Sequence, residues 1–446
     1  MSELEITPEF NQALELLEFS HQHVFVTGKA GTGKSTLLQH FRDTTKKKVA
    51  VLAPTGVAAL NVQGQTIHSF FRFRPDSTPE TVSRIRPAAP QAKLYKGLEA
   101  LVIDETSMLR ADLLDCIDMF LRKYGPKPGH FFGGVQMLFF GDLYQLPPVV
   151  TSFERSMFQS LYTGPHFFNA KVFNDIGLYM VELTTIYRQQ EEEFIALLNA
   201  IRTNSANPQH LETLNARHLP ENPSNGAITL TTTNDLADTV NHHHLDALDG
   251  RYFNWKATST GTFNDRDVPT PTELVLKNGA QVMLLTNDPR GRWVNGSIGS
   301  ITTIYDEPES TAPTIDVKLT TGRTVQVNPF TWELFKHAFN EGTGQVEPQV
   351  SGTYTQYPLR LAWAVTIHKS QGKTFDQVVI DLGRGTFSPG QLYVALSRCR
   401  TLDGITLRQP VLSRHVMSEP AIVTFLESFK DGYRKTGQAS LGFEDW

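Results

Sequence analysis

The chain has 446 residues, of which 40% are hydrophobic and 20% are charged, and its formal net charge is -5. At roughly 150 residues per domain, this length predicts more than one folded domain. The longest apolar runs fall well short of the roughly 20 residues that span a bilayer. The acidic N-terminal stretch lacks the features of a signal or transit peptide. We therefore expect a folded multidomain protein of the cytoplasm, and a bacterial one.

The net negative charge does not fit a protein that coats nucleic acid by bulk positive charge. Any nucleic-acid site is therefore expected to be a local channel. The two cysteines, Cys116 and Cys399, lack metal-ligand spacing. The sequence thus predicts buried reduced thiols rather than a disulfide framework or a zinc site.

Short apolar runs rich in β-branched residues alternate with helical stretches along the chain. The strand-like runs are, in chain order, HVFVTG, KVAVLAPT, ALVIDE, QMLFFGD, AITLTTTN and QVVIDLG, and the helical stretches include TLLQHFRD, MLRADLLDCIDMFLRKY and EEEFIALLNAIR. This pattern predicts an α/β fold with buried parallel sheets. Ligands of such sheets bind at the carboxyl ends of the strands, which is where the polar motifs below begin.

Two segments interrupt this alternation. Residues 71–97 are rich in proline and basic residues and contain no strand long enough for the sheet, so we expect an inserted arm. Residues 255–354 are rich in threonine and glycine and carry short alternating runs, which are typical of a small antiparallel β unit. We expect a β-barrel-like insertion there. The second set of strands, after residue 187, indicates a second lobe.

The strongest local signal is the stretch GKAGTGKST, which follows one expected strand and opens an expected helix. This is the P-loop pattern in its required context. Its glycines let backbone N–H groups wrap phosphates, Lys34 reaches the β- and γ-phosphates, and Ser35 offers a hydroxyl to Mg²⁺. We expect nucleotide contacts at Gly28, Ala30, Gly31, Thr32, Gly33, Lys34, Ser35 and Thr36.

Two further motifs narrow the class of nucleotide-binding protein. The run LVIDE ends an expected strand with Asp104 and Glu105. Asp104 would hold magnesium through water, and Glu105 would polarise the attacking water. The run GDLYQLPPV places Gln145 where its amide would touch the γ-phosphate. Solvated loop carboxylates and a surface glutamine are the alternatives.

The order of the motifs resembles that of the Pif-type (petite-integration-frequency) DNA helicases of superfamily 1B, which are related to RecD and to the phage Dda helicase. The resemblance runs from near residue 24 to near residue 407. The stretches that carry it are GKAGTGKST, APTGVAALNVQGQTIHSFF, LVIDETSML, FFGGVQMLFFGDLYQLPPV, ELTTIYRQ, AVTIHKSQGKTFD and QLYVALSRCRTLDGI.

The resemblance implies an ATP- and Mg²⁺-dependent motor that translocates 5′ to 3′ on single-stranded DNA and unwinds forked or tailed duplexes. We expect it to be a monomer in solution. It would have two RecA-like domains and two insertions. These domains are expected at residues 1–70 and 98–186 (first RecA-like domain), 71–97 (arm), 187–254 and 355–446 (second RecA-like domain) and 255–354 (β-barrel-like insertion).

The resemblance also implies roles for single residues. Arg188 and Arg398 would be arginine fingers that reach the γ-phosphate from the second domain, a task that suits planar, permanently charged groups. Gly372 would join the nucleotide site. In DNA-contacting motifs, small polar side chains suit phosphates, whereas histidines and Phe70 would stack on bases. The expected DNA contacts are Pro54, Thr55, His68, Phe70, Asn234, Asn295, His368 and Ser370, although His68 could equally be a core histidine.

The arm, residues 71–97, follows directly on one of these DNA-contacting motifs and has a local net charge of +4. A solvated loop would account for this charge. We favour a semi-rigid pin that holds phosphates near a fork, with Phe71, Phe73 or Tyr95 abutting the first base pair. The charged residues of the arm are Arg72, Arg74, Arg84, Arg86, Lys93 and Lys96, against Asp76 and Glu80.

One position departs from the family. Its usual N-terminal pattern, Leu-x-x-x-Gln, carries a glutamine that reads adenine, but Phe10 stands in that place and Gln12 follows two residues later. GTP or other triphosphates are therefore open as substrates. Two other readings of the whole chain also remain open: a DNA-stimulated ATPase that loads or binds without unwinding, and a motor that acts on RNA.

Overall fold

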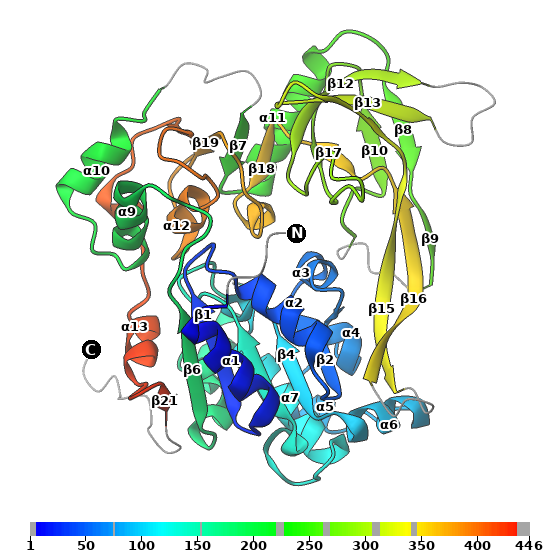
Figure 1. Ribbon diagram of the computed structural model, residues 1–446, viewed down its shortest axis with the longest axis vertical. Helices are drawn as coiled ribbons and strands as arrows, with labels where there is room; N and C mark the ends of the chain where they lie inside the picture. Colours follow the sequence, from blue (N-terminus) through cyan, green and yellow to red (C-terminus); the bar gives the residue numbers. More distant parts are fainter. Residues whose placement is uncertain are drawn as a thin grey trace. The chain divides into compact units, whose positions relative to one another are not determined.

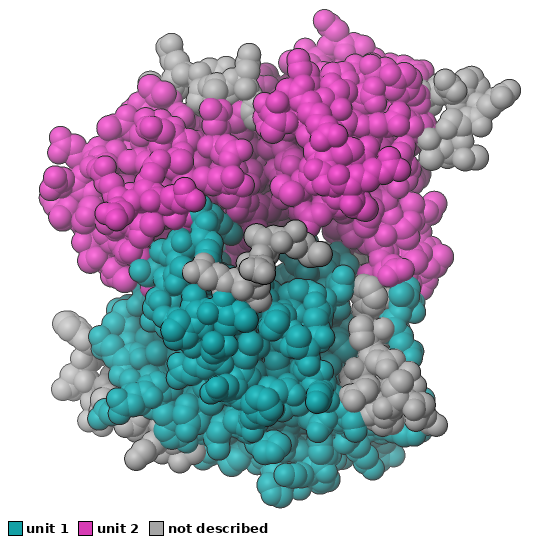
Figure 2. All heavy atoms as spheres, viewed as in Figure 1, with its two compact units in different colours: residues 1–188, 334–351, 419–446 teal, residues 189–333, 352–418 magenta. Residues whose placement is uncertain are grey.

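The computed structural model describes residues 6–74, 76–151, 154–219, 227–261, 268–305, 313–339 and 346–434. The chain divides into two compact units, which Figure 2 shows in different colours. Unit 1 comprises the described parts of residues 1–188, 334–351 and 419–446, and unit 2 those of residues 189–333 and 352–418. No helix within the described ranges is long and apolar enough to cross a membrane.

Unit 1 is built on a seven-stranded sheet in the order β21-β6-β1-β5-β4-β2-β3 (Figure 1). All pairs are parallel except the antiparallel pair of β21 with β6. Four predicted strands are confirmed here, and their carboxyl ends lie at one edge of the sheet. The strands are β1 (His23–Gly28), β2 (Val49–Ala53), β3 (Gln65–Thr66), β4 (Ala100–Ile103), β5 (Gln136–Phe140), β6 (Leu178–Leu183) and β21 (Tyr433–Arg434).

Helices cover this sheet because each buries an apolar stripe. In α7, for example, Leu114, Ile117 and Leu121 recur at helical spacing and are buried, and the helix stops before Gly125. The helices of unit 1 are α1 (Pro8–Phe19), α2 (Lys34–Thr44), α3 (Gly56–Asn61), α4 (Ile67–Phe71), α5 (Pro79–Val82), α6 (Ala89–Gly97), α7 (Ala111–Tyr124), α8 (Arg155–Leu161) and α13 (Pro420–Glu427). Short 3₁₀ turns are η1 (Thr106–Met108), η2 (Phe131–Gly134), η3 (Phe167–Asn169) and η4 (Lys171–Asn174).

Unit 2 contains a second parallel sheet, in the order β18-β7-β19-β20. The predicted strands AITLTTTN and QVVIDLG are its neighbours β7 and β19, so the expected second α/β lobe is confirmed. Its elements are α9 (Glu192–Arg202), α10 (Pro208–Asn215), β7 (Ile228–Thr231), α11 (Asn234–Ala247), β18 (Ala364–Thr366), η5 (His368–Ser370), β19 (Val378–Asp381), α12 (Gln391–Leu396), β20 (Ile405–Leu407) and η6 (Ser413–His415).

Between β7 and β18 the chain forms the expected antiparallel β unit. Its main sheet has the order β14-β13-β12-β11-β17 and packs Val282, Val317 and Val325 into a separate apolar core. Among the described strands this sheet has two edges, β14 and β17, so it does not close as a barrel. The strands are β8 (Phe253–Lys256), β9 (Thr258–Thr260), β10 (Glu273–Leu276), β11 (Gln281–Leu284), β12 (Ile298–Tyr305), β13 (Thr314–Leu319), β14 (Thr324–Val327), β15 (Phe330–Phe339), β16 (Val346–Gln356) and β17 (Leu359–Leu361).

Two parts of the expected second domain and its insertion belong to unit 1 instead. The first is the described part of residues 334–351, where the His337 backbone N–H donates to Gln65 Oε1 at 2.7 Å and the ring packs edge-on against Phe70. The second is residues 419–434, which carry α13 and β21. The compact units therefore divide the chain at other places than the expected segments 255–354 and 355–446, because long-range packing decides this grouping.

The C-terminal segment is held by aromatic packing and by polar contacts. Phe425 of α13 is 6% exposed and stacks on Phe168, with ring centroids 4.3 Å apart, and Phe25 and Phe167 lie edge-on or tilted beside it. His166 Nε2 lies 2.7 Å from a carboxylate oxygen of Glu419. These contacts make α13 part of the core of unit 1.

The expectation for residues 71–97 also needs correction. The segment is not an extended arm, because α5 and α6 pack against α7. Phe71, Phe73 and Tyr95 are at most 6% exposed and surround Phe120 of α7. They are not available to abut a base pair, so the aromatic part of the pin hypothesis is wrong. The segment is part of the fold of unit 1.

Replacing Phe425 by alanine should destabilise unit 1 by about 3 to 5 kcal/mol, because it leaves a cavity among packed rings. Urea unfolding followed by circular dichroism measures the loss. The matched control is Phe19→Ala, since Phe19 is 84% exposed and its removal should cost less than about 0.5 kcal/mol. Equal midpoints for the two variants would contradict the docking of α13.

Candidate functional site

The P-loop lies between β1 and α2, as predicted. Gly31 and Gly33 adopt positive φ angles of 82° and 86°, which only glycine adopts at little cost. The Lys34 ammonium donates to the backbone oxygens of Gly28 and Lys29 at 2.7 and 2.9 Å. The positive charge is therefore held against the loop itself, where backbone N–H groups and a helix N-terminus already favour an anion.

Other expected P-loop contacts share this frame. Thr32 is buried and its hydroxyl donates to the Lys29 backbone oxygen at 3.0 Å, which fixes the turn. Ala30 is also buried, whereas Ser35 and Thr36 in the first turn of α2 are exposed. A hydroxyl at Ser35 is thus accessible to a ligand.

Arg188 lies beside the P-loop within unit 1. A Cβ built on Gly31 would stand 2.5 Å from Arg188 Cβ, and the Tyr187 N–H donates to the Gly31 oxygen at 2.9 Å. The compact units group Arg188 with unit 1, whereas the sequence interpretation placed it in the second domain. The residue ends unit 1, and the loop has no side chain at position 31 so that Arg188 can approach.

Asp104 and Glu105 follow directly on β4. Burial, and then the adjacent charge of Glu105, raise the pKa of Asp104 to about 7, while the charge of Lys34 opposes this rise. Glu105 has a φ of 52°, a left-handed conformation that costs about 1 to 3 kcal/mol for a residue other than glycine. Such strain is concentrated at functional sites, which agrees with the catalytic role expected for Glu105.

The segment after β5 presents Gln145. The buried Asp142 carboxylate accepts from the Tyr144 N–H at 3.2 Å, and the Asp142 backbone oxygen accepts from the Gln145 N–H at 2.9 Å. This turn leaves Gln145 only 8% exposed. Its side chain is fixed by the fold rather than free on the surface.

The residues present fit a hydrated magnesium ion. The donor set expected from the sequence is the Ser35 hydroxyl and the Asp104 carboxylate, and Mg²⁺ prefers such hard oxygen ligands in small number. Burial first, and then the charge of Glu105, disfavour the ionised form of Asp104 and so raise its pKa. A divalent cation would stabilise that ionised form.

Arg398 is held inside unit 2, where it is 2% exposed. Its Nε donates to the Val394 oxygen at 3.0 Å and its Nη2 to Ser397 Oγ at 2.9 Å. Sequence reasoning missed its neighbour Gln189, whose Nε2 donates to the backbone oxygens of Ser397 and Cys399 at 3.2 and 3.0 Å. These acceptors flank Arg398, so Gln189 fixes the backbone on both sides of it. Its place directly after Arg188 in ELTTIYRQ was the available signal.

The expected DNA contacts of unit 1 differ in their surroundings. Thr55 caps α3, its hydroxyl accepting from the Ala58 N–H at 3.3 Å, and Pro54 precedes it at the end of β2. His68 is half-buried on α4. Phe70 is 4% exposed among Tyr95, Phe71 and His337, so the structure does not present it for stacking on a base, and that expectation is wrong.

In unit 2, Asn234 is exposed in the first turn of α11, where backbone N–H groups suit a phosphate. Ser370 is fully buried, and its hydroxyl donates to the Ile367 oxygen at 2.7 Å. Its side chain therefore stabilises a turn and is not exposed to contact DNA. Burial lowers the pKa of the nearby His368 below its usual value, which favours the neutral ring.

Asn295 contacts a residue that the sequence interpretation passed over. Lys373 Nζ donates to Asn295 Oδ1 at 2.9 Å, and Lys373 directly follows Gly372, which has a φ of 73°. Burial, and then repulsion by Arg360, lower the pKa of Lys373 to about 7. A buried cation with a cationic neighbour is a favourable partner for an anion. The run HKSQGKT contained this lysine, but nothing in the motif distinguished it.

Comparisons with known proteins identify the family of this chain. The sequence pattern of the PIF1-like helicases matches residues 9–210, and that of the UvrD-like helicase C-terminal domain matches residues 361–402. The chain is 33% identical over 441 residues to the ATP-dependent DNA helicase Pif1 of Bdellovibrio bacteriovorus, covering 96% of this chain and 93% of that one. It is also 33% identical to human ATP-dependent DNA helicase PIF1, over 92% of this chain and 62% of that one.

Solved structures give the same result. Bacteroides sp Pif1 in complex with ADP-AlF4 matches with a TM-score of 0.86 and 36% identity, covering 97% of this chain and 99% of that one. Bacteroides Pif1 bound to single-stranded DNA matches with a TM-score of 0.70 and 37% identity over the same shares. The two-lobed α/β fold is thus that of a known helicase family.

Two substitutions should separate the roles of the site. Lys34→Ala should lower ATP turnover by about 10²- to 10³-fold, because the phosphates lose a preorganised cation. Glu105→Gln should still bind Mg-ATP but hydrolyse it about 10²- to 10⁴-fold more slowly, because only water activation is lost. Nucleotide binding is measured with a fluorescent ATP analogue, and turnover by phosphate release.

Glu99→Gln is the matched control, since Glu99 is exposed one residue before β4 and should leave turnover unchanged. A Glu105→Gln protein that fails to bind nucleotide would show that Asp104 and Glu105 are misassigned.

Proposed function

Because this chain belongs to the PIF1-like helicase family, we propose that it hydrolyses ATP to move along single-stranded DNA and to unwind the duplex ahead. It is an ATP-dependent DNA helicase. The proposal rests on one observation. Lys34, Asp104 and Glu105 lie at the same edge of the unit 1 sheet, and Arg188 packs on the P-loop. A protein that binds ATP without hydrolysing it does not need a strained Glu105 next to Asp104, the expected magnesium ligand.

We propose the following division of work at the nucleotide. Lys34 and the P-loop N–H groups hold the phosphates, and Gln145 responds to the γ-phosphate. Mg²⁺, held by Ser35 and Asp104, would neutralise phosphate charge. Glu105 orients and polarises the attacking water, and Arg188 and Arg398 stabilise the charge that develops on the transferring phosphoryl group. Gly372, beside Lys373, lets the backbone approach the same phosphates.

We propose that Thr55, Pro54, His68, Asn234, Asn295 and His368 contact the tracked strand. Nucleotide-driven changes alternate the grip of the two units, so that hydrolysis becomes movement along the strand. Relatives bind such substrates: Bacteroides Pif1 is solved with single-stranded DNA, and two Pif1 helicases are described as coordinating at forked DNA. For this chain we propose 5′-to-3′ movement as a monomer, on forked or tailed duplexes.

The test compares nucleic acids as activators and substrates. ATP hydrolysis should rise at least about tenfold with oligo-dT and much less with oligo-U, and a duplex with a 5′ tail should be unwound but one with a 3′ tail should not. Stimulation without unwinding would favour a loading module, and stronger stimulation by RNA would favour an RNA motor. Sedimentation with and without forked DNA tests the monomer.

Nucleotide selectivity follows from Phe10. Its ring is buried, 6% exposed, and lies beside His40 with centroids 6.0 Å apart, so the position offers no amide to adenine. We expect kcat/KM values for ATP and GTP within about tenfold of each other, because apolar contacts discriminate bases weakly. Phe10→Gln should increase the preference for ATP, whereas Phe10→Leu should not.

A wild-type protein that rejects GTP by several orders of magnitude would contradict this prediction. Thermal unfolding of both variants checks that the core around position 10 survives.

A further inference from the structure

Residues 72–96 of unit 1 carry six basic residues against two acidic ones, Asp76 and Glu80. All six basic residues of this segment are exposed, although the segment itself is packed into the fold. Five of them form no ion pair with any carboxylate of the described residues. The basic face consists of Arg72, Arg74, Arg84, Arg86, Lys93 and Lys96, the five being all of these except Lys93.

The aromatic residues in this segment and directly before it all point inward. Phe71, Phe73 and Tyr95 lie in the core, and the Tyr95 hydroxyl donates to the Phe70 oxygen at 2.7 Å. Surfaces that grip single strands combine cations with exposed aromatic rings, because the unpaired bases need a stacking platform. This face offers cations without rings. Its ligand is therefore a phosphate backbone rather than unpaired bases.

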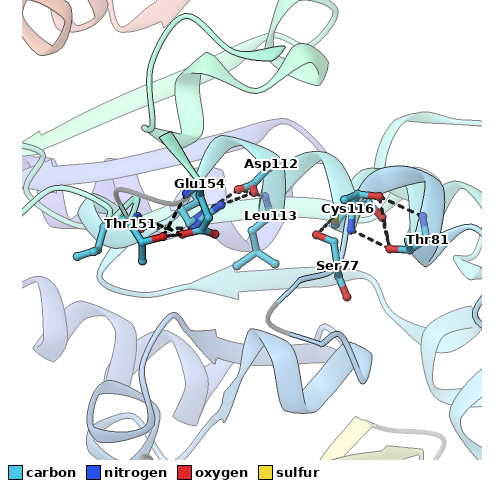
Figure 3. Close-up of polar contacts among 10 residues, drawn as sticks. Ser77, Thr81, Asp112, Leu113, Cys116, Thr151 and Glu154 are labelled. Carbon is cyan, nitrogen blue, oxygen red and sulfur yellow. Dashed lines mark hydrogen bonds and ion pairs between the residues drawn. The ribbon is translucent and has the colours of Figure 1, made fainter. Parts of the chain in front are cut away.

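Residues of α7 hold the backbone of this segment at three points. Cys116 Sγ lies 3.8 Å from the Ser77 oxygen, a contact drawn in Figure 3. Lys123 Nζ donates to the Ser83 oxygen at 3.0 Å, and the Tyr124 hydroxyl donates to the Ile85 oxygen at 2.7 Å. The backbone that carries the cations is therefore held in place, so the backbone loses little conformational entropy when the side chains meet a regular array of charges.

Duplex DNA carries such an array, with one negative charge per about 1.7 Å of helix axis. We propose that the basic face binds the phosphates of duplex DNA, as a second nucleic-acid site beside the single-strand track. It acts independently of base sequence and holds the duplex that is to be unwound. This proposal rests on the proposed helicase function for its biological setting, but duplex binding is measured without hydrolysis.

The test uses Arg84→Gln, Arg86→Gln, Lys93→Gln and Lys96→Gln together in the full chain. Binding of a fluorescent blunt duplex and of oligo-dT is measured by anisotropy from 50 to 300 mM salt, roughly the range over which counterion release is resolved. For the duplex, we expect the slope of log K against log salt to fall by about 0.9 for each phosphate that the variant no longer neutralises. Duplex affinity at low salt should drop at least about tenfold, with oligo-dT affinity within about twofold of wild type.

The matched control removes four exposed cations of unit 2: Lys256→Gln, Lys318→Gln, Arg323→Gln and Arg384→Gln. It should leave duplex affinity within about twofold of wild type. Equal loss in both quadruple variants would overturn the proposal in favour of bulk charge. Equal loss on duplex and oligo-dT would overturn it in favour of one single-strand track.

Circular dichroism melting checks the fold of both variants, whose substituted side chains all lie at the surface. The two proposals fail separately. A wild-type protein without ATPase stimulation by oligo-dT would refute the motor and leave the duplex measurement valid. A normal motor with an unchanged duplex salt slope in the basic-face variant would refute the basic face alone.

Discussion

The nucleotide site depends on how closely the backbone segments at the carboxyl edge of the unit 1 sheet approach one another. A Cβ on Gly28 would stand 2.5 Å from the Leu183 oxygen, which joins the ends of β1 and β6. A Cβ on Gly141 would stand 2.6 Å from Thr106 Oγ1, which joins the ends of β4 and β5. No side chain fits at either glycine, and these contacts bring the P-loop, the acidic pair and the Gln145 turn together.

That close approach buries negative charge, which a bound cation would stabilise. Asp104 and Glu105 are adjacent acids at a partly buried strand end, and burial and their mutual repulsion raise the pKa of Asp104 to about 7. The Lys34 charge lowers it only in part. A site that concentrates charge in this way sacrifices stability to be preorganised for a charged substrate and its cation. The strained backbone of Glu105 belongs to the same arrangement.

The sequence predicted what is local and failed where packing is remote. The P-loop, the acidic pair and the strands were predictable because each rests on the spacing of neighbouring residues. The packing of residues 419–434 in unit 1 could not be predicted, because contacts such as that of His166 with Glu419 join residues 253 positions apart. The segment 71–97 misled for another reason. Its charge was visible in the composition, but only the fold reveals that Phe71 and Tyr95 turn inward while the cations stay outside.

Where the chain passes from unit 1 to unit 2, hydrogen bonds link the neighbour of Arg188 to the segment that carries Arg398. Arg188 packs on the P-loop at Gly31, and the next residue, Gln189, donates to the backbone on both sides of Arg398. Consecutive Cα atoms are about 3.8 Å apart. The P-loop contact of Arg188 and the contacts of Gln189 around Arg398 therefore lie on adjacent residues. Gln189 is 2% exposed, and its side-chain amide donates to two backbone acceptors. The segment that carries Arg398 is thus tied to the residue that follows Arg188.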